Sequence, residues 1–335
     1  MLSYVLFRIA LIVPLLIGLS LLVFVIGRVL PGDPAALAAG PYATAEQRAA
    51  VAAEFGLDRP IAVQYWDYVT GLFEGDLGRS IMTRRPVAGD LALYLPATLE
   101  LVAASLLLAV AVSIPLGLVA GLTANRAPDM TISAGTLSAM SMPQFFLGLV
   151  LQLIFAMWLS LLPLSGRLPF TVAPPPAVTG FYTIDSVLAG QWHTLWLSLV
   201  HLALPAITMA LAPIAMITRI MRASTMEALQ QDYVRNARAL GLSIRLILFK
   251  YVLKNAASAT LTMIGLYVGW MLGSTVLVEK VFDWPGIGLY ATNAILNQDF
   301  NPVIAVTLVI GVIFIATNLI VDLLYGVLNP KVGDR

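Results

Sequence analysis

The sequence predicts an all-α integral membrane protein with six transmembrane helices. Of its 335 residues, 59% are hydrophobic and only 11% are charged, whereas soluble domains carry about 25% charged residues. A bilayer-spanning helix needs roughly 20 apolar residues. Segments of about that length lie at 7–29, 98–122, 134–162, 196–218, 257–278 and 303–325. Residues 31–95 are too long for a simple connector, and we expect an enlarged segment outside the membrane there.

The composition excludes several kinds of chemistry. The chain has no Cys, so disulfides, thiolate metal sites and cysteine nucleophiles are excluded. Its only histidines are His193 and His201, too few for an intramembrane metal centre of the usual kind. A net charge of +1 predicts no nucleic-acid partner.

The first apolar segment has to be distinguished from a signal peptide. Residues 9–26 are followed by Ala36-Leu37-Ala38, which resembles a cleavage site. The apolar run is longer than the about 7–15 residues of a signal peptide core. The basic flank is also limited to Arg8. We therefore interpret this segment as the first transmembrane helix.

The basic residues predict the orientation. Residues 219–254 hold seven of the 19 Lys and Arg and only two acids. The positive-inside rule places this stretch in the cytoplasm, and six spans then put both termini there. The segments 31–95, 163–195 and 279–302 would lie outside.

Turn and helix signals subdivide the outer segment. Pro31 to Pro34 and Gly75 to Gly78 are typical of turns. Between them we expect an amphipathic helix over 44–55, with Thr44 as its cap. The aromatic residues that suit a membrane–water interface are Tyr65, Trp66 and Tyr68. The segment is either a folded cap on the membrane or a docking element for an external partner.

The basic segment carries its own helix signals. Ser224 and Glu227 fit a capping box, which predicts that a helix begins there. Gly241 suits a left-handed helix end and Ser243 the cap of a second helix that enters the fifth span. One apolar stripe of the first helix would comprise Leu229, Tyr233, Ala237 and Leu240. Such a helix either lies on anionic lipid or docks in a partner's groove.

The predicted spans contain almost no ionisable residues at depth. Glu100 begins the second span, and Arg28 and Asp322 lie near span ends. Ion-coupled carriers retain such residues for function. The sequence also has no phosphate-binding loop of the GxxxxGK[ST] type. Transport would therefore draw its energy from another subunit, although a passive channel lacks the same features.

Residues 232–242, DYVRNARALGL, resemble the EAA loop of ABC-importer permeases in its peptide-importer version. Arg235, Asn236 and Ala237 take the places of the usual Glu-Ala-Ala, and Gly241 is the glycine of the pattern. Further matches follow in order at 30–34, 56–60 with 64–65, 75–78, 96–100, 141–143, 163–167, 279–282 with 284–286, and 322–325 with 329–330. The chain is similar to the first permease subunit of dipeptide and oligopeptide ABC importers.

This resemblance implies a type I ABC importer permease fold. Residues 1–95 would form the first helix and the outer segment, and 96–328 the transmembrane domain with helices 2–6. The implied partners are a second homologous permease, two cytoplasmic ABC ATPase subunits and a substrate-binding protein, assembled at a bacterial inner membrane. ATP and Mg would be used by the ATPases. The chain itself would bind no cofactor or metal and would catalyse no reaction.

The resemblance also assigns roles to residues. Within 222–255, the residues that would couple to the ATPase are Glu227, Asp232, Tyr233, Arg235, Asn236, Ala237, Arg238 and Gly241. The residues expected to dock the binding protein are Asp33, Asp58, Arg59, Tyr65 and Asp76. Pathway candidates are Ser141, Gln144 and Phe145, for which helix packing is the other interpretation.

The substrate and two other classes of protein stay open. Dipeptides, longer peptides, nickel chelates and glutathione are imported by systems of this architecture. A stand-alone carrier or channel would need intramembrane charges or a pore of its own. A membrane enzyme would need clustered nucleophiles, bases or metal ligands, which two separated histidines do not supply.

Overall fold

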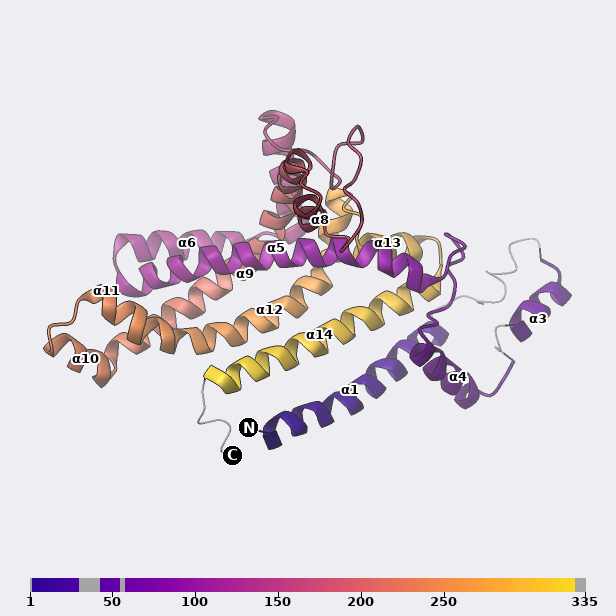
Figure 1. Ribbon diagram of the computed structural model, residues 1–335, viewed down its shortest axis with the longest axis horizontal. Helices are drawn as coiled ribbons and strands as arrows, with labels where there is room; N and C mark the ends of the chain where they lie inside the picture. The colour runs from indigo at the N-terminus through magenta and orange to yellow at the C-terminus, as the bar shows by residue number, and fades with distance from the viewer. Residues whose placement is uncertain (1, 30–42, 55–57, 329–335) are drawn as a thin grey trace.

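The protein is a bundle of long helices that run along one common direction (Figure 1). The computed structural model describes residues 2–29, 43–54 and 58–328. The long helices are α1 (Leu2–Val29), α5 (Val87–Leu122), α9 (Trp192–Gln230), α12 (Leu253–Phe282) and α14 (Phe300–Leu328). In these described ranges no strand is formed, and the only β pairing is an isolated bridge between Arg79 and Pro86.

The third predicted span is sharply bent. Helix α6 (Ala127–Ser141) and helix α7 (Gln144–Leu151), which continues as the π-helix η1 (Gln152–Trp158), meet at an angle of 103°. Pro143 has no N–H to donate and forces Met142 into an extended conformation, with φ −100° and ψ 134°. The expectation of one continuous helix over 134–162 is therefore wrong. Helix α8 (Tyr182–Leu188) packs against α9 in the part of the molecule that projects from the side of the bundle (Figure 1).

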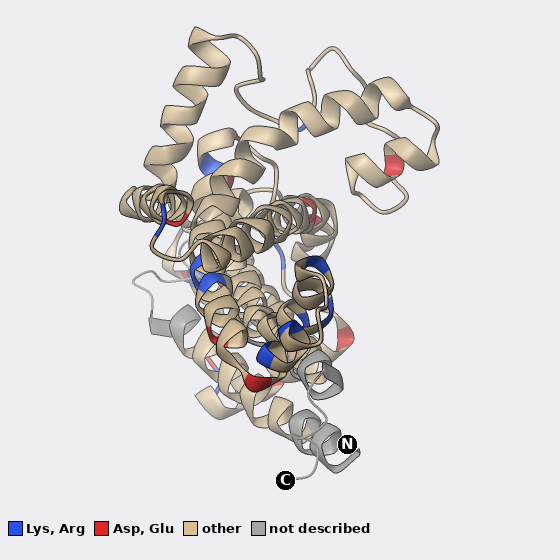
Figure 2. Cartoon of the chain, turned by 90° about the vertical axis from the view of Figure 1, so that its left-hand side faces the viewer, with Lys and Arg blue, Asp and Glu red and all other residues tan. Residues whose placement is uncertain are grey.

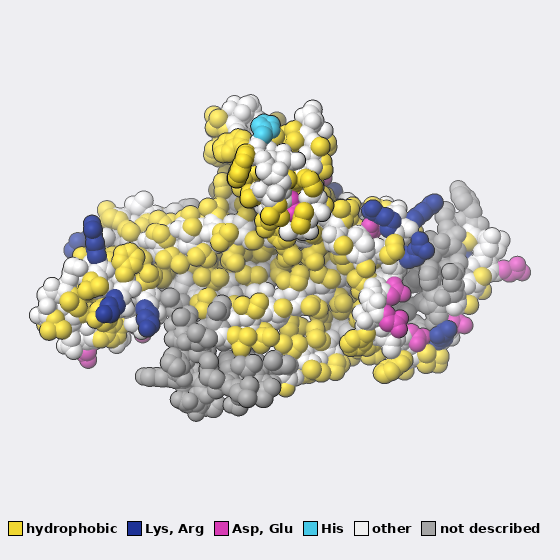
Figure 3. Space-filling view, viewed as in Figure 1, with side chains coloured by type: hydrophobic (Ala, Val, Ile, Leu, Met, Phe, Trp, Pro, Cys, Tyr) yellow, Lys and Arg dark blue, Asp and Glu magenta, His cyan; other side chains and the backbone are white. Residues whose placement is uncertain are grey.

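The long helices suit a membrane. Four of those described are long and apolar enough to cross a bilayer, or five if the bent pair is one span. The described side chains of α1, over Ala10–Val25, are apolar but form a shorter stretch. Hydrophobic side chains cover the middle of the molecule, and charged ones gather at its two ends (Figure 3). The chain is a multi-pass membrane protein.

The two ends carry different short helices. At one end, called here the α10 end, lie α10 (Asp232–Ala239), α11 (Ile244–Ile247) and the π-helix η2 (Leu248–Val252). At the other, the α4 end, lie α3 (Ala45–Glu54), α4 (Ile61–Glu74) and α13 (Ile287–Leu296). Lys and Arg gather at the α10 end (Figure 2). The expected cap of α3 is confirmed, since Gln47 N donates to Thr44 Oγ1 at 3.2 Å.

Helix α9 lies at the centre and packs against α5, α6, α7, α8, α10 and α12. It approaches α5 closely where α5 has glycine. A Cβ added at Gly121 would lie 2.6 Å from Thr225 Cβ, and one at Gly117 would lie 2.5 Å from Met221 Cβ. Small residues allow membrane helices to pack at such distances. The buried core between α5, α9 and α12 includes Leu101, Leu204, Met209, Met271 and Phe282.

Candidate functional site

The EAA-like segment, residues 222–255, forms a hinged helical hairpin at the α10 end. Helix α9 continues to Gln230, and the extended Gln231 separates it from α10. Helix α11 then leads through η2 directly into α12. Ser243 caps α11 as expected, because its side chain accepts a hydrogen bond from Leu246 N. The second predicted helix, which enters the fifth span, is thus confirmed.

The first helix does not begin at Ser224, so the predicted capping box is wrong. Ser224 and Glu227 lie inside α9, which runs without interruption to Gln230. The N–H groups of this stretch have partners in the preceding turn, so no cap is needed. Burial of Thr225 against α5 holds the helix together past the expected boundary.

The apolar side of α10 lies on the ends of the long helices. Val234 and Ala237 are buried, and Tyr233 stacks on Tyr251 with ring centroids 6.3 Å apart. Burial, and secondarily the charge of Glu227, raises the pKa of Tyr233. Leu240 was expected in the same stripe but is 79% exposed, because the chain already turns there. The cluster beneath α10 is completed by Ala228, Ile247 and Val252.

Gly241 ends α10 in the left-handed conformation that the sequence predicts, with φ +73°. Gly241 N donates to Arg238 O at 3.0 Å, and Leu242 N donates to Ala237 O at 3.2 Å. This pair of hydrogen bonds is a Schellman motif, which satisfies carbonyls at the helix end. The turn therefore has a defined geometry.

The polar side of α10 faces outward. Its exposed residues are Asp232, Arg235, Asn236 and Arg238. Arg235 and Asp232 are 3.5 Å apart, but both side chains are so exposed that the pair contributes little to stability. Glu227, one turn before the end of α9, is exposed as well. Seven of the eight expected coupling residues thus lie in or next to α10, and Glu227 lies nearby at the end of α9. The charged and amide side chains among them are exposed to solvent.

An ion pair ties this end to the bent helix pair. Asp129 at the start of α6 accepts two hydrogen bonds from Arg222 of α9, at 2.5 Å from Nε and 2.7 Å from Nη2. Asn125 N donates to the same carboxylate at 2.8 Å. Bidentate pairs of this kind fix geometry as well as charge. Sequence reasoning counted Arg222 as a topology signal and missed its partner, because 93 residues separate them.

The residues expected to dock a binding protein are placed at the α4 end. Asp33 lies outside the described residues. Asp58 is exposed, Arg59 pairs with Asp67 at 2.9 Å, and Asp76 accepts a hydrogen bond from Gly78 N at 2.8 Å. Arg59 and Asp76 therefore have partners within the same segment of the chain.

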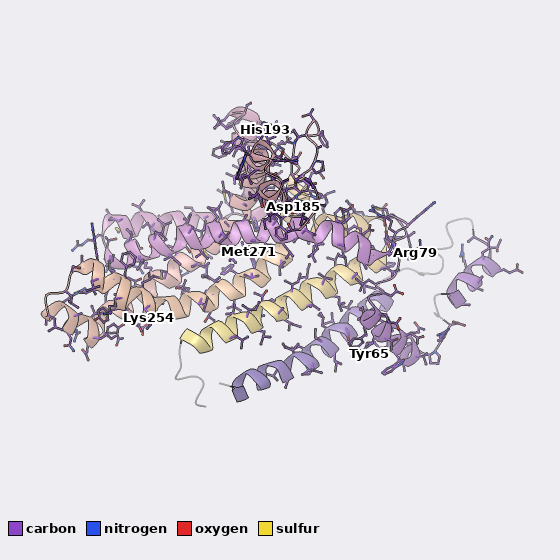
Figure 4. The ribbon with its side chains drawn as sticks, in the orientation of Figure 1. Tyr65, Arg79, Asp185, His193, Lys254 and Met271 are labelled. Atoms are coloured by element: carbon purple, nitrogen blue, oxygen red, sulfur yellow. The ribbon has the colours of Figure 1, made fainter. Side chains whose placement is uncertain are left out.

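Tyr65, the fifth of these candidates, attaches α4 to α1. Its hydroxyl lies 2.9 Å from Ser20 Oγ, and its ring meets Phe24 edge-on at 5.3 Å. Tyr68 packs beside it, and burial, followed by the proximity of Tyr65, raises the pKa of Tyr68 to about 12. Trp66, on another side of α4, is 68% exposed. Figure 4 labels Tyr65 where α4 meets the bundle.

The three pathway candidates lie at the bend between α6 and α7. Ser141 donates to Leu137 O at 2.9 Å within its own helix. Gln144 Nε2 is buried and has no hydrogen-bond partner in the described chain. Phe145 is 44% exposed. The three side chains therefore lie at an irregular point of the helix pair.

A buried carboxylate that sequence reasoning missed joins three helices. Glu279 is fully buried in α12 and accepts hydrogen bonds from Thr98 Oγ1 at 2.6 Å and Leu289 N at 2.9 Å. Thr98 Oγ1 in turn accepts from Ile287 N at 2.9 Å. A Cβ at Gly286 would lie 2.3 Å from Glu279 Oε1, so the neighbouring turn requires glycine. Because α12 extends to Phe282, Glu279 is inside a helix that was expected to end at 278.

A buried ion pair ties the loop between η1 and α9 to α5. Arg167 pairs with Glu100, donates to Gly180 O at 2.9 Å and lies 3.5 Å above the ring of Tyr182. Glu100 also accepts from Thr183 N at 2.8 Å. Glu100 is the acid that the sequence already places at the start of the second span, and Glu279 lies just beyond the predicted end of the fifth span at residue 278. Both accept hydrogen bonds from several groups, as buried polar atoms in native structures do.

Within the described part of the chain no group of three or more His, Asp or Glu is arranged to hold a metal ion. The buried acids are instead paired with Arg, Thr and backbone N–H groups. What the structure offers is a helical membrane bundle with a hinged polar hairpin at one end. These features define a multi-pass helical membrane protein that exposes a short polar helix at one end.

Comparison with known proteins identifies the family. Residues 113–334 match the family model described as binding-protein-dependent transport system inner membrane component. Residues 1–102 match the model for the N-terminal part of such membrane components. The chain belongs to this family of inner membrane components.

Individual relatives match over nearly their whole length. The probable D,D-dipeptide transport system permease protein DdpB of Escherichia coli K12 is 40% identical over 94% of this chain and 93% of the relative. The dipeptide transport system permease protein DppB of the same strain is 37% identical over all of both chains. The glutathione transport system permease protein GsiC of Salmonella choleraesuis is 36% identical over 99% of each. The resemblance to peptide-importer permeases is thereby confirmed.

Proposed function

We propose that the chain is a permease subunit of an ATP-driven importer that moves dipeptides or oligopeptides inward. The observation that carries this proposal is α10, a short polar helix that rests on the bundle by Val234 and Ala237 and exposes its charged side. A helix held this way can transmit a push from a partner to the membrane helices as a rigid-body motion. Family membership supplies the setting, since its members work with a binding protein.

The proposed architecture has six spans and the type I importer fold, with residues 1–95 and 96–328 as its two parts. The spans would be α1, α5, the bent pair from α6 to η1, α9, α12 and α14. The basic α10 end would face the cytoplasm, as would both termini. The segment between α1 and α5 would then be the enlarged outer part.

The energy would come from partner subunits. Two ATPases would bind ATP and Mg and would each receive a helix such as α10, one from this chain and one from a second, homologous permease. Motion of α10 would pass into α9 and α12, because α9 precedes it and α11 with η2 joins it to α12. The Asp129–Arg222 pair would carry the same motion into α6.

Peptides are the favoured substrate, because dipeptide and di/tripeptide permeases are among the relatives that match the chain over 93% or more of their length. Glutathione, itself a tripeptide derivative, is the second candidate because a glutathione permease is almost equally similar.

The test is uptake by the complete assembly. The chain, its second permease and two ATPases are reconstituted in vesicles with the binding protein and ATP, and uptake of a labelled dipeptide is measured. Accumulation should require ATP and every subunit. Competition with unlabelled glutathione separates the two substrate candidates. Equal accumulation by vesicles that hold only this chain would contradict the proposal.

A further inference from the structure

Residues 79–86 form a compact loop at the α4 end, called here the arginine loop. Ser80 N donates to Arg85 O and Arg84 N to Ser80 O, both at 3.0 Å, and Arg79 pairs with Pro86 in a β bridge. Arg84 holds a left-handed backbone with φ +58°, a conformation that non-glycine residues adopt at a free-energy cost. The surroundings must therefore impose this shape.

Two buried carboxylates supply that constraint. Asp299, which precedes α14, accepts from Ser80 Oγ at 2.6 Å and from Met82 N at 3.1 Å. Asp90, in the first turn of α5, accepts from Thr83 Oγ1 at 2.6 Å. Both acids are 1% exposed.

Further contacts hold the same loop from other elements. Arg85 pairs with Asp90 at 2.8 Å, and Tyr290 of α13 donates to that carboxylate at 2.9 Å. Asn301 donates to Arg79 O at 2.9 Å. The loop is thus fastened to α5, α13 and the start of α14, so its outer side has a fixed shape.

The outer side of the loop combines apolar and positive groups. Ile81 and Met82 are 44% and 48% exposed, and Arg79, Arg84 and Arg85 are exposed around them. Figure 3 shows Lys and Arg side chains gathered at this end, and Figure 4 labels Arg79 there. Arg and Met are enriched in protein–protein interfaces, where a small apolar centre is flanked by polar groups.

We infer that the arginine loop is a preformed docking surface for an acidic patch, with an apolar centre, on the soluble protein that delivers the solute. A protein partner fits better than an anionic lipid surface. At the same end α4 and its flanks carry acids that would repel anionic headgroups, among them Asp58, Asp67, Glu74 and Asp76. A folded partner can match both signs of charge and so be held in one orientation. The inference rests on the proposed function.

The test uses the complete complex in nanodiscs of phosphatidylcholine, with the purified binding protein added in increasing amounts. The readout is the binding-protein concentration that gives half-maximal stimulation of the ATPase. Arg84→Glu should raise that concentration about tenfold, since an attractive charge becomes a repulsive one. Basal ATPase should be unchanged, and the effect should weaken at higher salt. Arg48→Glu, which makes the same charge change on α3, serves as the matched control.

A second variant tests the fixed shape of the loop without changing any arginine. Ser80→Ala removes the hydrogen bond to Asp299 and should raise the half-maximal concentration less than Arg84→Glu does. Equal behaviour of Arg84→Glu and Arg48→Glu would overturn the inference. So would an effect of Arg84→Glu that appears only when anionic lipid is added, because the loop would then bind headgroups. If the binding protein fails to stimulate even the unaltered complex, the proposed function itself fails.

Discussion

At the scale of single residues, Gly241 connects backbone geometry to coupling. Its φ of +73° is required by the Schellman turn, and the space around a Cβ there is open. A substitution at this position would therefore strain the backbone without causing a clash. The effect of backbone strain at this turn can therefore be measured without an added steric clash.

Gly241→Val should reduce uptake while ATP hydrolysis continues. A β-branched residue resists positive φ, at a cost of about 1–3 kcal/mol, so the turn after α10 would distort. Uptake and ATPase rate in the reconstituted complex are the two measurements. Gly241→Asn is the control, because Asn tolerates the left-handed region. If the Val variant transports as well as the Asn variant, the turn has no role in coupling.

Buried acidic side chains are a second feature at the scale of single residues. Glu100, Asp129 and Glu279 each accept hydrogen bonds from groups far away in the sequence. Each carboxylate therefore connects two or more elements by hydrogen bonds. Removing the arginine partner of Glu100 or Asp129 would leave a buried charge unpaired, which commonly costs about 3–5 kcal/mol.

At the scale of elements, the loop between η1 and α9 is held by a carboxylate. Asp185 in α8 accepts hydrogen bonds from Thr179 N at 2.8 Å, Thr179 Oγ1 at 2.7 Å and Gly180 N at 2.9 Å. Burial raises the pKa of Asp185, but the hydrogen bonds from Thr179, Gly180 and Val178 together lower it below the usual value. The loop is thus built around the ionised form.

Asp185→Asn should lower the free energy of unfolding at neutral pH by about 1.5–3 kcal/mol, which is the usual contribution of a hydrogen bond to a charged group. Because the folded-state pKa is depressed, this stabilisation is present above the pKa of an unfolded aspartate. It is lost as the pH falls through the lower folded-state value. The difference in melting temperature between the two proteins, measured from pH 7 to pH 3, should be constant at first and then shrink. A difference that grows toward acid pH would contradict the assignment.

At the scale of the whole molecule, the two ends differ in charge. Basic residues dominate at the α10 end, whereas acids and arginines share the α4 end (Figures 2 and 3). The apolar band between them fixes how the bundle sits in a bilayer, and the basic end sets its direction.

Because the chain has no Cys, single cysteines can report this direction. Glu74→Cys at the α4 end should react with a membrane-impermeant maleimide in intact cells. Gln230→Cys at the α10 end should react only after the membrane is permeabilised. Both positions are exposed, so each should react in detergent. Labelling of Gln230→Cys from outside would reverse the proposed orientation.

The sequence by itself determined the helical membrane class, the approximate places of the long helices, the glycine turn at 241 and the family. The first three follow from local properties, namely apolar length and turn residues, whereas the family follows from the resemblance of motifs such as residues 232–242. Residue types also predicted the caps at Thr44 and Ser243 correctly. The predicted cap at Ser224 failed because burial of Thr225 against α5 carries α9 onward.

Pro143 accounts locally for a break between α6 and α7, but only the tertiary structure decided its angle of 103° and the partners of the buried acids. It also decided the fixed shape of the arginine loop. Thr98 and Glu279 are 181 residues apart, and Ser80 and Asp299 are 219 apart. No local pattern encodes such pairs, because they exist only once α5, α12, α13 and α14 have packed together and excluded solvent from the groups between them.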